Sequence, residues 1–117
     1  MLNEPTLEEL CQLPTVEASL QERPEHRIAR MHFFSTDSQW FIVAYEPRPD
    51  LLFSYTIHSG FGSRGAPYQF MQWEYSYFGM MCMERGANGA PFVRNENWVP
   101  QPVYEIPCVR HYRKMLR

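Results

Sequence analysis

The side chains best suited to chemistry in this chain do not fall into a known catalytic or metal-binding spacing. The four histidines are scattered, at His26, His32, His58 and His111. Metal sites and metal-dependent hydrolases favour short fixed spacings such as HExxH, and the sequence contains none. We therefore expect no metal site and no cofactor.

Nucleophilic and acid–base catalysis are not indicated either. The sequence has no G-x-S-x-G elbow, and Glu46 and Glu74 are the only acids that we expect on strands. We expect His32 and His58 to be structural histidines that share one sheet face with Trp40. The chain is therefore predicted not to be an enzyme.

Cysteine usage and hydropathy predict the compartment. Cys11, Cys82 and Cys108 are odd in number and form no CxxC pair, so neither a zinc site nor a disulfide framework is indicated. The chain lacks a signal-peptide pattern and an apolar run of the roughly 20 residues needed to span a bilayer. These features predict a cytoplasmic protein with no membrane association.

Charge is distributed unevenly along the chain, although the net charge is only -2. Residues 1–26 hold six acids against one arginine, giving -5, whereas residues 110–117 hold three arginines and one lysine, giving +4. Either the two ends are solvated or lie against each other, or the basic tail binds an acidic partner. The net charge argues against a general affinity for nucleic acid.

The N-terminal region predicts short helices. Thr6-Leu7-Glu8-Glu9 has the pattern of a capping box, and Pro14 should end the helix that follows it. A second turn is expected over residues 15–21.

The rest of the chain predicts an antiparallel sheet. Two-residue periodicity predicts a half-buried strand over residues 28–33, a strand apolar on both faces over 40–45 and a third over 51–57. Turns at 35–38 and 47–50 are too short for parallel crossovers, so these strands should form a meander. A glycine-rich loop at 59–67, with no phosphate-binding pattern, should precede further strands near 73–78 and 92–99.

These elements predict one α+β domain spanning residues 1–117. It should contain an antiparallel meander of four or five strands, a short N-terminal helix and a basic C-terminal segment near residues 109–116. The aromatic fraction is 15%, so bulky rings should fill the core or form an exposed recognition face. The methionines at 80, 81 and 83 are interpreted mainly as core residues.

A family resemblance follows from an ordered set of residues between Arg30 and Glu105. The set comprises Phe33-Phe34, Trp40, Pro47, Asp50, Phe53, Glu74, Tyr77-Phe78, Met80, Met83, Gly89, Pro91, Arg94, Trp98, Pro100 and Glu105. In this order they resemble the bacterial family catalogued as domain of unknown function 2958. The chain departs from that family at Ala44, Val93 and Asn95, where members carry acids, and in the loop from Gly60 to Met71, which looks like an insertion.

The resemblance implies an accessory protein of a plasmid, phage or other mobile element, with no established reaction. We therefore expect a non-catalytic protein that binds a host or element-encoded protein, for example as an inhibitor of a CRISPR or restriction complex. The residues predicted to bind the partner are Phe61, Arg64, Tyr68, Trp73, Arg113 and Lys114. The alternative is binding of single-stranded nucleic acid or a nucleotide by an aromatic sheet face that includes Trp40, Tyr55, Trp73, Tyr75 and Tyr77.

Overall fold

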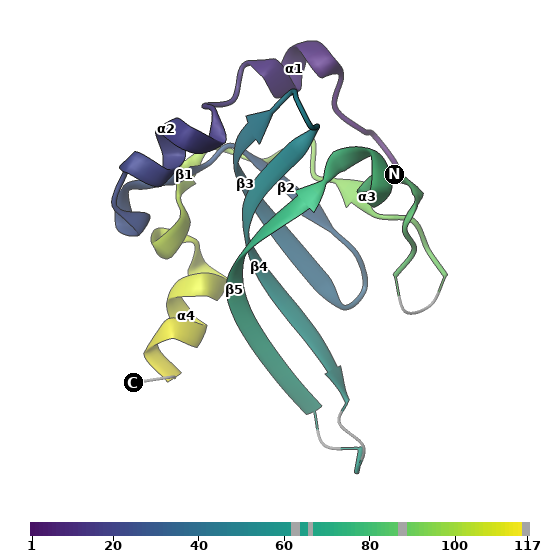
Figure 1. Ribbon diagram of the computed structural model, residues 1–117. Helices are drawn as coiled ribbons and strands as arrows, with labels where there is room; N and C mark the ends of the chain where they lie inside the picture. The colour runs from purple at the N-terminus through teal and green to yellow at the C-terminus, as the bar shows by residue number, and fades with distance from the viewer. Residues whose placement is uncertain (62–63, 66, 87–88, 116–117) are drawn as a thin grey trace.

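The computed structural model describes residues 1–61, 64–65, 67–86 and 89–115 (Figure 1). These residues form an α+β fold whose centre is a five-stranded antiparallel sheet, as the sequence predicts. The elements in chain order are α1 (Leu7–Cys11), α2 (Val16–Gln21), η1 (Pro24–His26), β1 (Ile28–Ala29), β2 (Met31–Phe34), β3 (Ser38–Glu46), β4 (Leu51–Phe61), β5 (Pro67–Tyr77), α3 (Phe78–Met83), β6 (Val93–Arg94), β7 (Gln101–Pro102), η2 (Val103–Glu105) and α4 (Pro107–Met115).

The first helix begins at the predicted cap, and the second begins within the turn predicted over 15–21. The Thr6 side chain accepts a hydrogen bond from the Glu9 amide, and the Glu9 carboxylate accepts one from the Thr6 amide. This confirms the capping box. At α2, the Thr15 hydroxyl oxygen accepts from the Ala18 amide. Each helix is too short to persist by itself, so both depend on docking against the sheet.

Strands β2 to β5 form the predicted meander, and the order across the sheet is β5-β4-β3-β2-β6. The hairpin of β4 and β5 is longer than the sequence suggests. Its pairing runs from Leu51 opposite Tyr77 to Phe61 opposite Pro67. The predicted loop over 59–67 was therefore too long, because both of its ends belong to strands. We call residues 57–61 and 67–71, the outer end of this hairpin, the ribbon tip.

Two predicted strands differ in the structure. The strand expected over 28–33 is divided between β1, which pairs with β7, and β2, which pairs with β3 and β6. The last strand, expected over 92–99, is limited to Val93–Arg94. It ends there because the Asn95 side chain accepts from the Asn97 amide, a local turn that takes the chain out of the sheet.

A β-bulge changes which side chains of β3 share a face. Pairing with β4 shifts register between Ile42 and Ala44. An extra residue reverses the two-residue alternation, so Ala44 lies with Phe41 and Val43 rather than with Trp40 and Ile42. The alternation that the sequence predicts along 40–45 therefore holds only up to the bulge.

Short helices cover both faces of the sheet. On the first face, Val16 of α2 and Val109 of α4 pack on one buried cluster, whose other members are Ala29, Phe41, Val43, Ala44, Phe53, Tyr55, Ile57, Val103 and Ile106. On the second face, Leu10 of α1 and Met81 of α3 pack on the other, with Leu13, Met31, Phe33, Trp40, Ile42, Tyr45, Leu52 and Phe92. Met81 is therefore a core residue, as predicted, whereas Met80 and Met83 are exposed.

Asp50 connects the turn between β3 and β4 to α3. It has a positive φ of 72°, a conformation that aspartate tolerates better than most residues. Its carboxylate accepts hydrogen bonds from the Tyr45 hydroxyl and the Gly79 amide, and its carbonyl accepts from the Phe78 amide. The turn therefore holds the first residues of α3 against the sheet.

An ion pair joins the first helix to the other edge of the sheet. The Arg94 guanidinium donates to the Glu9 carboxylate at 2.7 Å. This hydrogen bond, together with that from the Thr6 amide, lowers the pKa of Glu9 to about 2 from 4.5. Because the folded carboxyl binds its proton less readily than the unfolded one, the pair stabilises the fold above about pH 4.5. That contribution is lost as the pH falls towards 2.

We predict that Glu9→Gln lowers the urea midpoint of unfolding at pH 7. The difference from the parent chain should shrink between pH 4.5 and pH 2, because the carboxylate becomes protonated, and in high salt, because the pair is only partly buried and so is screened. Glutamine keeps the capping-box geometry, so the change isolates the charge. Glu8→Gln, in the same exposed first turn, is the control and should show a much smaller pH-dependent difference. Equal behaviour of the two variants would contradict the assignment.

Candidate functional site

The ribbon tip and the end of α4 enclose an apolar groove. The outer end of the β4–β5 hairpin extends beyond the other strands (Figure 1). The groove has a volume of about 670 Å³. Its lining residues are Thr36, Asp37, Ser59, Gly60, Phe61, Pro67, Tyr68, Gln69, Phe70, Met71, Tyr112 and Met115. Phe61 is 77% exposed and Met115 67% exposed, so two of its largest apolar side chains lie largely in solvent.

Gly60 allows the Tyr68 ring to lie across the strand. A Cβ atom at Gly60 would lie 2.7 Å from the Tyr68 hydroxyl oxygen, closer than a real Cβ contact. The Tyr68 ring also stacks on Phe70 at a centroid distance of 6.2 Å. Because Gly60 and Tyr68 are paired residues on the second face of the hairpin, the Tyr68 ring occupies the space that a side chain at residue 60 would fill.

The residues predicted to bind a partner are only partly brought together. Phe61 and Tyr68 line the groove, and Lys114 lies on α4, next to the groove residue Met115. Arg64 is exposed in the turn between β4 and β5. The helix residues Tyr112 and Met115 escaped the sequence analysis, although their spacing from Cys108 along a short basic helix was a usable signal.

Trp73 belongs instead to a packed stack on the first face of the sheet. The Arg27 guanidinium lies 4.6 Å from the Trp73 ring centroid, and the indole N–H donates to the Tyr104 hydroxyl at 3.3 Å. Arg113 lies 3.5 Å above the Tyr104 ring. Trp73 and Arg113 are therefore already engaged by their own chain.

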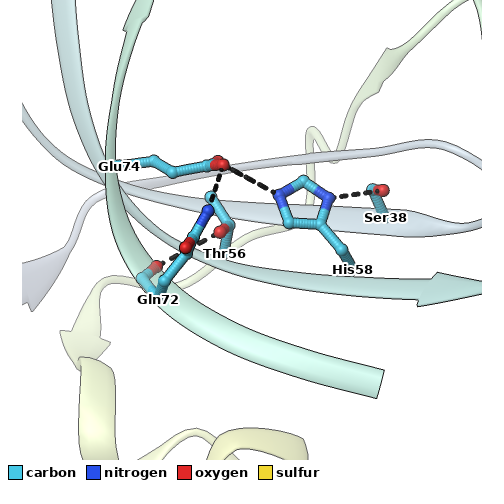
Figure 2. A network of polar contacts seen from close by, with 5 residues as sticks. All are labelled: Ser38, Thr56, His58, Gln72 and Glu74. Atoms are coloured by element: carbon cyan, nitrogen blue, oxygen red, sulfur yellow. Dashed lines mark hydrogen bonds and ion pairs between the residues drawn. The ribbon is translucent and has the colours of Figure 1, made fainter. Parts of the chain in front are cut away.

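A polar network on the second face of the sheet connects β3, β4 and β5. Figure 2 shows the His58 ring between Glu74 and Ser38. The Ser38 hydroxyl oxygen lies 2.9 Å from Nδ1, and the Glu74 carboxylate 3.1 Å from Nε2. The Gln72 amide donates to the same carboxylate at 2.6 Å, and the Thr56 hydroxyl donates to the Gln72 carbonyl at 3.1 Å. His58 and Glu74 lie 16 residues apart in the chain, and the sequence did not predict that they meet.

The network contains a Ser–His–Glu chain, an arrangement that can move a proton. A carboxylate on Nε2 assigns the proton of neutral His58 to that nitrogen, so Nδ1 accepts from Ser38. In serine proteases the two ring nitrogens have the opposite roles. A pocket of about 310 Å³ lies beside the network, and its lining includes His58, Glu74 and Trp40 but not Ser38. A ligand in this pocket would contact His58 and Glu74 but not the Ser38 hydroxyl. The geometry therefore favours a structural role for the network.

The two sheet histidines lie on opposite faces, which corrects the expectation that they share one with Trp40. His58 does pack against Trp40, with ring centroids 5.5 Å apart. His32 stacks on Phe41 of the first face at 4.9 Å. Its Nε2 lies 3.0 Å from the Gln39 amide oxygen, and burial lowers its pKa. His32 is therefore a neutral core residue.

The cysteines carry no sign of activation. Burial raises the pKa of the Cys82 thiol to about 12 and also raises that of Cys108. Thiols with raised pKa values are poor nucleophiles. Within the described ranges, no group of three His, Cys, Asp or Glu side chains is placed to hold a metal ion. No helix in that part of the chain is long and apolar enough to cross a membrane.

Comparison with known proteins gives no significant match: no family model matches the chain, nor does any curated protein or solved structure. The family resemblance therefore stays a prediction. The sheet carries two candidate sites, an apolar groove at one end and a polar network on one face.

We predict that Ser38→Ala and Glu74→Ala each lower the free energy of unfolding by about 1 kcal/mol, because each removes a hydrogen bond to His58. The double variant should lose less than the sum, since both act through the same ring. Denaturant titrations of the four proteins measure the coupling. Additive losses would show that the ring does not couple the two groups.

A fluorophosphonate probe tests the catalytic alternative. We expect Ser38 to remain unlabelled, because Ser38 lies outside the pocket that is lined by His58 and Glu74, so no bound ligand would meet all three groups. Mass spectrometry of the treated protein reads this directly. Labelling of Ser38 that disappears in Glu74→Gln would reveal an activated serine and overturn the structural role.

Proposed function

We propose that this chain is a non-catalytic binding protein that contacts a partner protein through the groove between the ribbon tip and α4. The proposal rests on one observation: the apolar side chains of Phe61 and Met115 are largely exposed in the groove. Contiguous apolar surface on a folded chain, bordered by polar residues, is typical of binding sites. Aromatic and methionine side chains are also those that most often anchor protein interfaces.

The same geometry supports a protein partner over single-stranded nucleic acid. A stacking platform needs neighbouring aromatic rings exposed on one face. Trp40 and Tyr55 are buried on opposite faces, and Trp73 lies under Arg27. Glu74 places a carboxylate on the second face, where it would repel phosphates. Of the aromatic face proposed from the sequence, only Tyr75 and Tyr77 are exposed, since Trp40 and Tyr55 are buried and Trp73 is partly buried.

The identity of the partner is proposed from the family resemblance alone. We propose a cytoplasmic host protein or one encoded by a mobile element, with a CRISPR or restriction complex as the specific candidate. The support is the ordered set of residues between Arg30 and Glu105. The groove supplies a means of binding but does not select among such partners.

We predict that Phe61→Ser combined with Met115→Ser abolishes partner capture while leaving the fold intact, because both side chains line the groove and are largely solvent-exposed. The control is Leu7→Ser with Val99→Ser, which removes two exposed apolar residues outside the groove lining. Affinity capture from the native host, read by mass spectrometry, should lose the same proteins only in the groove variant. Circular dichroism checks the fold. Equal retention by both variants would exclude the groove.

The defence hypothesis has its own test. Expression of the chain in a strain that carries a CRISPR or restriction system should raise the plating efficiency of a targeted phage. The groove variant should not raise it, and the Leu7→Ser, Val99→Ser control should. An unchanged plating efficiency for the parent chain, across strains with each type of system, would reject an anti-defence role while leaving the binding proposal to the capture experiment.

A further inference from the structure

Helix α4 presents two different surfaces to the groove and to solvent. Cys108, Tyr112 and Met115 are spaced as i, i+4 and i+7 and so form one stripe, of which Tyr112 and Met115 line the groove. At 100° per residue, His111 and Lys114 follow this stripe on its solvent side. The helix contains Arg110, Arg113 and Lys114 and no acid, so it carries three positive charges.

These three charged side chains differ in whether they contact other residues of the chain. Arg113 is held over the Tyr104 ring at 3.5 Å. Lys114 and Arg110 are exposed, and neither forms an ion pair with another residue that the structure describes. Lys114 is the nearer of the two to the groove stripe along the helix surface. The solvent-facing border of the groove on the α4 side is therefore basic.

Among the residues that the structure describes, the opposite wall of the groove carries one acidic side chain and no basic one. The acid among its lining residues is Asp37, whose carboxylate accepts a hydrogen bond from the Ser35 hydroxyl at 2.8 Å. The remaining lining side chains are apolar, aromatic or uncharged polar groups. A ligand in this groove would therefore bury apolar surface at the centre and meet net positive charge along α4.

We propose that the occupant of the groove is an acidic segment of the partner protein that carries one aromatic or long aliphatic anchor residue. The anchor lies among Phe61, Met71, Tyr112 and Met115, and flanking carboxylates lie towards Lys114. This inference rests on the proposed function, because it specifies the partner of the same groove. Apolar contact supplies most of the affinity, and the charges of α4 select acidic over basic segments.

Selection from a random 12-residue peptide library displayed on phage tests the proposal on the purified full chain. The enriched peptides should hold several acids around one aromatic or long aliphatic residue. Their binding, measured by fluorescence anisotropy of the synthetic labelled peptides, should be lost with Phe61→Ser, Met115→Ser. Lys114→Glu should weaken it roughly fivefold at low salt, and less in high salt.

The matched control is Arg23→Glu, which makes the same charge change on an exposed arginine of the N-terminal region. It should leave peptide affinity nearly unchanged. Selected peptides that need the groove but are basic or uncharged would overturn the acidic-partner inference and leave the proposed function standing. Peptides that bind equally well to the Phe61→Ser, Met115→Ser variant, or the absence of any selected peptide, would overturn both.

Discussion

The structure depends on the burial of β3 and β4 between two separate apolar clusters. Both strands are hydrogen-bonded on each side within the sheet, and their side chains fill the core on each face. Burial of apolar surface is the dominant favourable term in folding. The surrounding helices are short, and each is fixed by a few contacts with this central pair. Leu10 and Met81 cover one face, and Val16 and Val109 the other.

Polar contacts decide where those short helices sit. The ion pair of Glu9 and Arg94 fixes α1 to the β2–β6 edge, and Asp50 fixes the start of α3. Glu46 acts similarly at α2, because its carboxylate accepts from the Val16 amide at 2.9 Å. Each contact satisfies a backbone or side-chain group that docking would otherwise leave unpaired. The apolar clusters supply most of the stability, and these contacts supply the positions.

The candidate sites occur where this cover ends. β4 and β5 continue beyond the helices, so the apolar residues of the ribbon tip are not fully buried and form one wall of a groove. On the second face, the middle of β4 and β5 carries Thr56, His58, Gln72 and Glu74 instead of apolar side chains. Hydrogen bonds across the strands replace helix packing there. Because β4 and β5 are longer than the part of the sheet that the helices cover, they form both the groove and the polar network.

The sequence by itself determined the local elements: the capping box at Thr6, the turn at residues 47–50 and the doubly apolar strand that became β3. Each depends on neighbouring residues, whose propensities and alternation are readable from the chain. The tertiary structure decided which residues meet. The bulge at residues 42–44 reversed the alternation of β3, Trp73 packed against the core, and Ser38, His58 and Glu74 converged from three strands. Such proximity depends on strand register, which is set by packing across the whole sheet and which no short pattern encodes.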